Sequence, residues 1–556
     1  MSPRRLVVRS LWPCPALLDL NLDGFFAVDV LEASLVDLGR LTVEHQSTSL
    51  QGDNPRAVGA RQAEEMQTAD HGHALAIDLL KVLEHGVRCR CGAERASRPT
   101  ISRVSTAVRR YIRSLGLDAY VVGGAVRDEL LGIRHRDEDF LVPGVDQDAL
   151  RAVLSPHGRV EDMEVHGQLV GVRFHPRDPD IRSLTPHGIE VTPPRAERST
   201  GPGHRDFEIV ADPSIPLAED MGRRDFTVNA MARRLETGEL IDPFGGVRDL
   251  ASRELRTVSA TSFRDDPLRM LRGLRLVSQL GFALASETLA QMTAEAEGLR
   301  HVSGERIGGG LSADGMGELS KLLLGAEPAR ALRIARDTGV LVAFLPEFEA
   351  AIGYGLDTDR QPAPLDEHLF RVAQEAAGAG ASLATRLAAL LHDLGKPETD
   401  VAGDDHAAAG ARLAGTILRR LRYPTRLRQR VVAIVRAHAF HTDGEVNGAP
   451  ARRFLARHGE LAFDLIAHKL ADLATKRVPE EELERARRLR DALETERDSP
   501  HRLRDLAVAG GDLIGLGFEE GPELGRVLHV LLEDVIDDPS RNERAFLLAR
   551  AGAERS

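Results

Sequence analysis

The chain has 556 residues, a length typical of roughly three or four domains. Hydrophobic residues make up 42% and charged residues 28%, and no apolar run reaches the ~18 residues of a membrane-spanning helix, so we expect a sizeable buried core and exclude an integral membrane protein. The net charge of −12 argues against a basic nucleic-acid coat but is compatible with an RNA enzyme that has a local basic face. The three Cys residues cannot build a disulfide scaffold, which predicts a reducing, cytoplasmic setting.

Residues 1–100 differ in pattern from the rest, and Gln46–Asp70 is polar with no sustained period, which predicts a poorly ordered N-terminal extension. The apolar stretch Leu6–Leu20 follows two arginines, as in a signal peptide. A tryptophan and two prolines interrupt it and no A-x-A cleavage site follows, so we do not expect secretion.

Regular patterns begin near Ile101. The expected elements are a helix over 101–115, strands over 119–122, 139–142, 171–174, 188–192 and 239–242, a turn at Gly123-Gly124 and a helix over 125–132. Long Leu- and Ala-rich helical periods fill residues 263–556. The pattern predicts an α+β protein, with a small mixed sheet in the first part and helices in the rest.

The first motif with chemistry is Val121–Asp128, a strand, a diglycine turn and a helix start. The glycines let the backbone approach a phosphate, and the helix N-terminus and Arg127 offer hydrogen-bond donors. Asp137 and Asp139 follow, and an Asp-x-Asp on a strand puts both carboxylates on one face, where their repulsion favours bound cations. Each half alone is common in ordinary turns and loops, but together they predict two Mg²⁺ ions held for in-line phosphoryl chemistry.

These residues resemble the DNA polymerase β-like nucleotidyltransferase superfamily, and the stretch Gly123–Gly132 is similar to its bacterial tRNA nucleotidyltransferase and poly(A) polymerase branch. The resemblance continues in family order over about residues 101–556. It implies that Glu190, in the strand Ile189–Thr192, is a third catalytic acid beside the two Asp. The nucleotide-binding residues that it implies are Gly123, Gly124, Arg127, Arg223, Arg224, Asp225, Asn229, Asp266, Arg269 and Arg272.

The motif Asp265–Arg269 resembles the family's E-D-x-x-R, and Asp266 and Arg269 are three apart, so we expect them on one helix face. Cytosine and adenine each present an amine donor beside a ring-nitrogen acceptor, which a carboxylate and a guanidinium can match. Guanine and uracil invert the pattern, at a cost of about 1–3 kcal/mol per lost pairing. Protein side chains can therefore select CTP and ATP without a template, although an ordinary helix acid and salt bridge would give the same pattern.

Two departures from the family bear on the exact substrate rather than the chemistry. Glu138 stands between the two Asp where the family normally has an apolar residue, and we expect it to face the other side of the strand. The segment 177–206 is longer and richer in proline than expected.

A second set of residues lies in the helical part and resembles the HD phosphohydrolase superfamily. The family's metal ligands map to His368, His392, Asp393 and Asp472, and His406 and His438 would hold a second ion. The resemblance implies a divalent metal of unspecified identity, and phosphatase or cyclic phosphodiesterase activity on damaged RNA 3′ ends. Lys396 is either a phosphate contact or a solvated helix cap.

We therefore expect an extension over 1–100, a nucleotidyltransferase head over 101–232, a helical neck and RNA-binding domain over 233–352, an HD domain over 353–500 and a helical tail over 501–556. The expected activity is template-independent addition of CMP and AMP from CTP and ATP to the tRNA 3′ end, with no membrane partner and with protein partners left open. Three alternatives remain: an A-only adding enzyme or poly(A) polymerase, an HD phosphohydrolase with an inactive head, and a non-catalytic RNA-binding protein.

Overall fold

The computed structural model describes residues 5–9, 17–21, 103–133, 138–165, 168–199, 207–309, 316–355, 360–402, 405–442 and 444–555. The chain divides into two compact units, Met1–Arg95 and Ala96–Ser556. In the first unit, β1 (Arg5–Arg9) and β2 (Leu17–Asn21) form an antiparallel pair, and the rest of the expected N-terminal extension lies outside the described residues.

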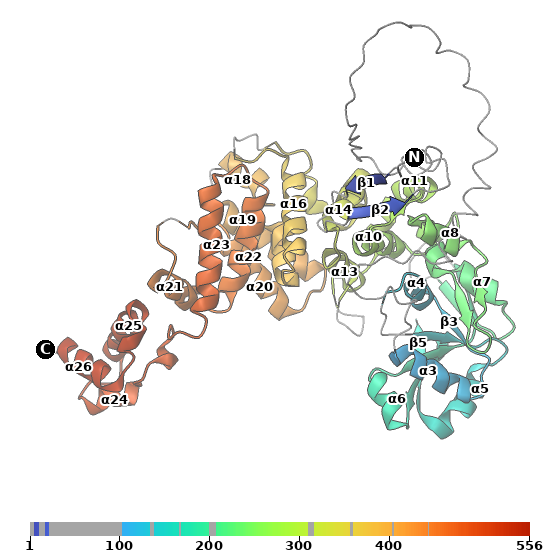
Figure 1. The fold of residues 1–556 in the computed structure, drawn as a ribbon, viewed down its shortest axis with the longest axis horizontal. Coiled ribbons are helices and arrows are strands. Elements are labelled where there is room, and N and C mark those ends of the chain that lie inside the picture. The colour runs from blue at the N-terminus through green and yellow to red at the C-terminus, as the bar shows by residue number, and fades with distance from the viewer. Residues whose placement is uncertain are drawn as a thin grey trace, which may run out of the picture. The chain divides into compact units, whose positions relative to one another are not determined.

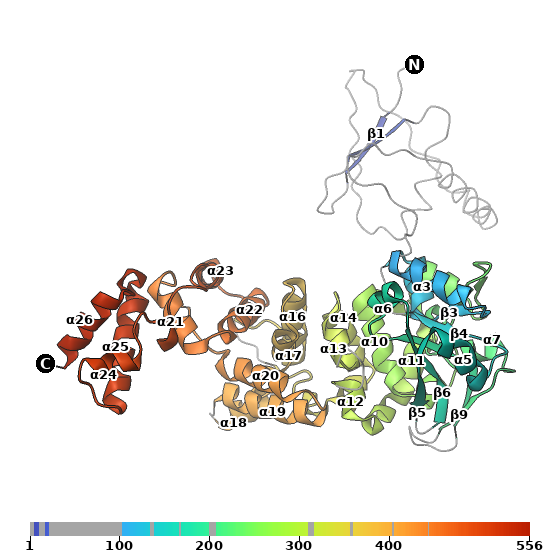
Figure 2. The same ribbon diagram turned by 90° about the horizontal axis from the view of Figure 1, so that it is seen from below.

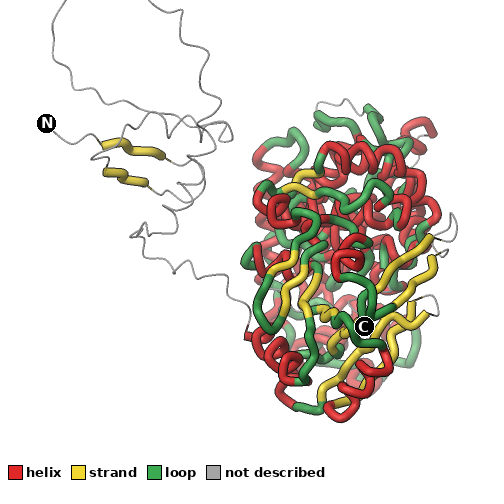
Figure 3. The backbone as a smooth tube through the Cα atoms, turned by 90° about the vertical axis from the view of Figure 1, so that its right-hand side faces the viewer, coloured by secondary structure: helices red, strands yellow, loops and turns green. Residues whose placement is uncertain are grey.

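The second unit begins with a seven-stranded mixed sheet in the order β11-β10-β3-β4-β7-β6-β5 (Figure 1). The strands are β3 (Tyr120–Val122), β4 (Asp139–Leu141), β5 (Gly158–Val165), β6 (Gln168–Pro176), β7 (Ile189–Thr192), β10 (Ala232–Arg234) and β11 (Leu240–Ile241). Strands β4 and β7 run parallel, and every other neighbouring pair in this sheet is antiparallel. Figure 3 looks onto this part of the chain, where the strands are yellow.

Side-chain alternation along β4 divides the head into two apolar layers, because successive residues of a strand point to opposite faces. Phe140 and Val142 are buried with Ile112 of α3 (Arg103–Ser114) in one cluster. Figure 2 labels α3 and β4 in this part of the chain. Leu141 is buried with Met221 of α7 (Leu217–Gly222) in another. The remaining elements of the head are α4 (Gly124–Leu130), α5 (Gln147–Leu154), α6 (Pro179–Leu184) and the antiparallel pair β8 (Arg195–Ser199) and β9 (Phe207–Ala211).

Helices follow the head almost without interruption. The first group is α8 (Gly246–Ala251), α9 (Ser262–Asp265), α10 (Leu268–Leu280), α11 (Ser286–Glu295), α12 (Gly304–Ile307), α13 (Glu318–Leu323), α14 (Pro328–Asp337) and α15 (Val340–Phe344), with a short parallel pair of β12 (Glu254–Leu255) and β13 (Ala283–Leu284). Buried Leu and Ala residues join these helices to the next group in one continuous core.

The second group is α16 (Leu365–Gly378), α17 (Leu383–Leu391), α18 (Lys396–Ala402), α19 (His406–Arg420), α20 (Thr425–Ala437), α21 (Ala449–His458), α22 (Leu461–Ala474) and α23 (Glu480–Thr495). The last helices, α24 (Gly510–Gly515), α25 (Pro522–Asp537) and α26 (Arg544–Glu554), have an apolar cluster of their own. Among the described helices, none combines the length and apolarity that crossing a bilayer requires.

Candidate nucleotide site and metal centre

One cavity of about 410 Å³, lined by the head and by the first helices after it, collects the residues predicted for nucleotide transfer. Its walls include Gly123, Gly124, Arg127, Asp139, Glu190, Arg223, Arg224, Asp225, Asn229, Asp266, Arg269 and Arg272. Asp137, the other predicted head residue, lies outside the described residues. Residues more than a hundred positions apart thus meet at the place that the motifs indicate.

The diglycine turn requires glycine at its first position. Gly123 has φ +73°, and a Cβ there would lie 2.6 Å from Nη1 of Arg224. Helix α4 begins at Gly124, and Arg127 on this helix donates from Nη1 to Oδ1 of Asn229 at 2.7 Å. The turn therefore lies against two arginines, as a phosphate-binding turn needs.

Two carboxylates face each other across neighbouring strands. Asp139 pairs in register with Glu190 across the parallel ladder of β4 and β7, so both side chains are on the same sheet face, and both line the cavity. Asp139 is exposed, whereas Glu190 accepts a hydrogen bond from Nη2 of Arg173 at 2.6 Å. Carboxylate oxygens at this position suit a hard cation such as Mg²⁺.

Asp225 is buried in the loop after α7 and is the hub of its hydrogen bonds, because three neighbours donate to it. Its carboxylate accepts from the backbone N–H of Phe226 at 2.8 Å, from Nδ2 of Asn229 at 2.9 Å and from Nε of Arg272 at 2.7 Å. Burial by itself would raise the pKa of Asp225, but the charge of Arg272 and these hydrogen bonds hold that pKa well below its usual range. The hub orients Asn229, which in turn holds Arg127.

Asp220 is a residue that the motifs did not indicate. It is fully buried and accepts from Nη2 of Arg223 at 2.8 Å and from Nη2 of Arg224 at 3.3 Å. Burial lowers the pKa of Arg224, and the charge of Asp220 opposes that shift. Asp220 therefore fixes the two adjacent arginines and offsets part of their charge.

The expectation that Asp266 and Arg269 share one helix face is wrong. Asp266 is extended, with φ −143° and ψ 102°, because a residue before proline avoids the helical conformation, and α10 begins only at Leu268. Its Oδ2 accepts from Nη2 of Arg306 at 2.7 Å, a contact that the sequence did not indicate. Arg269 is buried and donates from Nη2 to the backbone oxygen of Arg223 at 2.6 Å. Asp266 and Arg269 still line the same cavity.

The second set of predicted residues lies between helices of the second group, and we call it the HD cluster. Its members are His368, His392, Asp393, His406, His438 and Asp472. Three imidazoles have the same arrangement, because their Nδ1 atoms face outward to oxygen acceptors: His392 to Ala389 O at 3.0 Å, His438 to Val435 O at 2.7 Å and His368 to Thr475 Oγ1 at 3.1 Å. A proton on Nδ1 leaves the Nε2 lone pair free to face the centre. This donor chemistry fits a divalent ion.

Asp393 lies between two sets of donor atoms. Among the described residues, one set with all atoms within 4.8 Å joins Asp393 to His368 and His392, and another joins it to His406 and His438. The closest approaches are 3.2 Å from His392 Nε2 to Oδ2 and 3.4 Å from His438 Nε2 to Oδ1, so the two carboxylate oxygens serve different sets.

Asp472 stands beside the first set, with Oδ1 3.2 Å from Nε2 of His368. A lysine neighbours each buried carboxylate: Lys396 lies 2.6 Å from Asp393 and Lys476 lies 2.6 Å from Asp472. Burial opposes the charge on both Asp residues, yet their polar and cationic neighbours hold both pKa values well below the usual range. Both acids are therefore ionised at neutral pH.

Burial also acts on the histidines. It lowers the pKa of His392 to about 4, against the opposing charge of Asp393, so this ring is neutral at pH 7. His468 is a further buried imidazole that the motif did not indicate. Its ring centroid lies 4.7 Å from that of His392 and 5.7 Å from that of His438. Its position one helical turn before Asp472 is the signal that could have found it.

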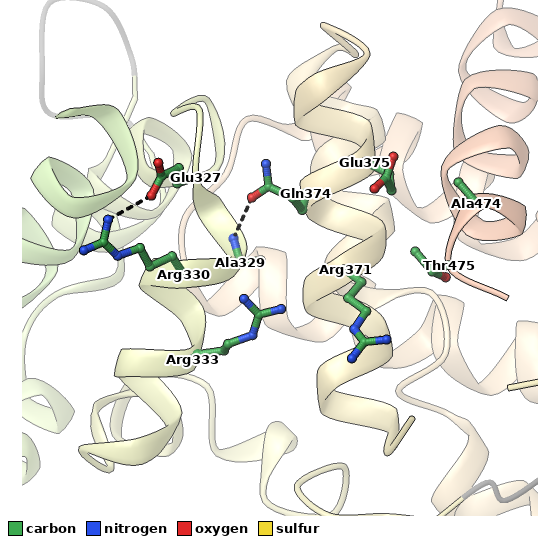
Figure 4. Close-up of a pocket in the computed structure, with 9 residues that line it drawn as sticks. All are labelled: Glu327, Ala329, Arg330, Arg333, Arg371, Gln374, Glu375, Ala474 and Thr475. Atoms are coloured by element: carbon green, nitrogen blue, oxygen red, sulfur yellow. Dashed lines mark hydrogen bonds and ion pairs between the residues drawn. The ribbon is translucent and has the colours of Figure 1, made fainter. Parts of the chain in front are cut away.

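A cavity of about 390 Å³ lies between α14, α16 and the end of α22 (Figure 4). Its guanidinium groups are paired with acids: Arg330 with Glu327, and both Arg333 and Arg371 with Glu367. Thr475, which holds the ring of His368, forms part of its wall. The cavity therefore adjoins the HD cluster but presents little excess charge.

Family models match three stretches of the chain. A poly A polymerase head domain matches residues 119–256, a probable RNA and SrmB-binding site of polymerase A matches residues 281–352, and an HD domain matches residues 365–509. The two candidate sites fall inside the first and third of these regions, except that Asp266, Arg269 and Arg272 follow the head match.

Relatives that the chain matches over about three quarters of their length give the same picture. The chain is 37% identical to a multifunctional CCA protein of Azoarcus sp. over 59% of this chain and 75% of that protein, and 36% identical to one of Ralstonia nicotianae over 62% and 77%. The crystal structure of the Bacillus stearothermophilus CCA-adding enzyme in complex with CTP is similar at a TM-score of 0.56 and 26% identity, over 83% of this chain and 98% of that one. The chain thus belongs to the bacterial tRNA nucleotidyltransferase and poly(A) polymerase family, beside the multifunctional CCA proteins, and carries an HD domain.

Proposed function

We propose that this chain completes the CCA end of tRNA, adding CMP and AMP from CTP and ATP to the RNA 3′ end without a nucleic-acid template. The observation that carries the proposal is the single cavity that gathers twelve motif residues from the turn and α4, the two carboxylate strands, the loop after α7 and the segment at the start of α10. The similarity to multifunctional CCA proteins over three quarters of their length supports the same activity.

The residues have distinct tasks in this reaction. The 3′-oxygen of the RNA attacks the α-phosphorus of the nucleotide, a new P–O bond forms, and the bond to the β-phosphate breaks to release pyrophosphate. Gly123 allows close approach of the triphosphate, and Arg127 and Arg224 offset its charge. Asp225 keeps Asn229 and Arg272 in place beside the sugar.

Asp139, with Asp137 and Glu190, would hold two Mg²⁺ ions. When bound, these ions supply the Lewis-acid chemistry that activates the acceptor hydroxyl and stabilises the leaving pyrophosphate. The register pairing of Asp139 with Glu190 supports this assignment, because it sets two oxygen donors side by side in the cavity.

Asp266 and Arg269 would read the incoming base. Asp266 accepts from the exocyclic amine of cytosine or adenine, and Arg269 donates to the ring nitrogen beside it. The contact of Arg306 with Asp266 holds the carboxylate in one orientation and so supports this reading.

The test is incorporation of radiolabelled nucleotides into a tRNA that lacks its terminal CCA, with each triphosphate supplied separately and then in pairs. We expect CTP alone to add two residues, and ATP to add one after CTP. No incorporation from CTP alone, with addition from ATP to a tRNA ending in CC, would instead indicate an A-only adding enzyme.

We further propose that the HD cluster is a metal-dependent phosphohydrolase acting on phosphates at RNA 3′ ends. The observation that favours it is the sharing of Asp393 between two donor sets, with Lys396 and Lys476 alongside. Nitrogen-rich donor sets favour a transition-metal ion over Mg²⁺. Release of phosphate from 2′,3′-cyclic and 3′-phosphorylated oligonucleotides, after chelation and readdition of single metals, tests it.

We propose that the head comprises residues 101–232, the neck 233–352, the HD domain 353–500 and the tail 501–556. The scarcity of Cys supports a cytoplasmic setting for the enzyme.

A further inference from the structure

Glu138 stands between Asp137 and Asp139 in the Asp-x-Asp motif, and its side chain is only 4% exposed. It points to the face of β4 that packs on α3, away from Asp139 and the cavity. There it accepts a hydrogen bond from Nε of Arg109 at 2.9 Å. A buried acid in place of an apolar side chain must be compensated by a cation, and Arg109 supplies it.

Arg109 does not serve Glu138 alone. Its Nη1 donates to Oε2 of Glu129 at 2.7 Å, and Oε1 of Glu129 lies 3.1 Å from Nε of Arg233. Two acids and two arginines thus form a chain of contacts with no net charge. We call these four residues, Arg109, Glu129, Glu138 and Arg233, the rear network.

The rear network joins the elements that carry the active residues. Glu138 precedes Asp139 at the start of β4, and Glu129 lies on α4, the helix that starts at the diglycine turn and carries Arg127. Arg233 lies on β10, shortly after Asn229. The network therefore connects β4, α4 and β10 to one another on the side of the sheet opposite Asp139.

We propose that Glu138 is a positioning residue of the transfer reaction, which through Arg109 fixes the carboxylate strand relative to the phosphate-binding helix. An apolar residue at this position could only fill space, whereas a hydrogen-bonded ion pair also sets direction and register. The proposal rests on the proposed transfer activity. Its consequence is that the affinity for divalent metal at the head depends on a side chain that does not face the metal.

The test measures metal binding directly as well as activity. Variants Glu138→Leu, Arg109→Met and the double variant are compared with Glu138→Gln, which keeps a hydrogen-bond acceptor and guards against loss of folding. The first readout is the additional Mn²⁺ that the protein binds when a CTP analogue with an unreactive α–β bridge is added, measured by electron paramagnetic resonance. The second is the Mg²⁺ concentration that gives half-maximal CMP addition. Because the HD cluster contributes equally with and without the analogue, the difference reports on the head.

We expect the single variants Glu138→Leu and Arg109→Met to weaken the nucleotide-dependent Mn²⁺ binding. They should also raise the half-maximal Mg²⁺ concentration about tenfold or more, because residues that orient metal ligands typically have effects of this size. The KM for CTP should change much less. The double variant should recover part of the loss, since neither charge is then left alone. Replacing the exposed pair Arg234 and Asp118, with Nε 2.8 Å from Oδ1, is the matched control and should change neither readout.

A purely structural role predicts a different result. The variants would then melt earlier but, below their melting temperature, bind Mn²⁺ and respond to Mg²⁺ as the wild type does, and this outcome would overturn the proposal. Failure of the proposed transfer activity is distinguishable, because the wild type itself would then incorporate no nucleotide.

Discussion

Asp225→Asn is the substitution whose cost the structure defines most closely. Oδ1 of Asp225 accepts from both Phe226 and Asn229, and an amide oxygen can keep those two bonds. Oδ2 accepts from Nε of Arg272, and an amide nitrogen there would present a donor to a donor. One charge-assisted hydrogen bond is lost, worth about 1.5–3 kcal/mol. The next acid, Glu318, does not replace it, because its Oε1 is 3.8 Å from Nη1 of Arg272.

Calorimetry of the purified variant should show the head destabilised by about that amount, and KM for CTP and ATP should rise about tenfold or more with a smaller change in kcat. The pKa of Asp225 is lowered in the folded state, so the stability that this carboxylate contributes is present above its unfolded pKa of about 3.9 and is lost as the pH falls below that value. The difference in stability between variant and wild type should therefore be constant between about pH 5 and 8. Asp146→Asn, at a helix cap, is the control. A variant within about 0.5 kcal/mol of wild type at pH 7 would refute the assignment of Asp225 as the hub.

Further expectations concern the two sites separately. Asp139→Asn should lower incorporation of both CMP and AMP by roughly 10²–10⁴-fold while phosphate release by the HD domain persists; equal loss of both would contradict the division into two sites. Asp393→Asn should do the reverse and lower the metal content seen by elemental analysis. In EDTA, the contribution of His392 to stability should fall by about 3 kcal/mol from pH 7 to 4, because this ring takes up its proton near pH 6.5 when unfolded but only near pH 4 when folded. Urea titrations of His392→Phe should therefore show a smaller loss of stability over this range than those of the wild type. Gly123→Ala should raise KM for both nucleotides in steady-state assays, and an unchanged KM would mean that Arg224 simply moves aside.

Much of the architecture could be predicted from local pattern. The expected strands over 119–122 and 188–192 are β3 and β7, and the helical remainder is confirmed. Strand β5 was missed because, at the edge of the sheet, it carries charged side chains that hide its period. Strand β10 was missed because two of its three residues are arginines, so it lacks the short apolar run that indicated β3.

The sequence by itself determined which chemical groups are present and in what order, since motif residues such as Gly123, Asp139 and His392-Asp393 are recognisable from type and spacing. Only the tertiary structure decided which of them act together. The pairing of Asp139 with Glu190 and the contact of Arg306 with Asp266 join residues 51 and 40 positions apart, and Asp393 meets partners from several helices. Such contacts depend on strand register and helix packing, which are set by the whole core rather than by neighbouring residues.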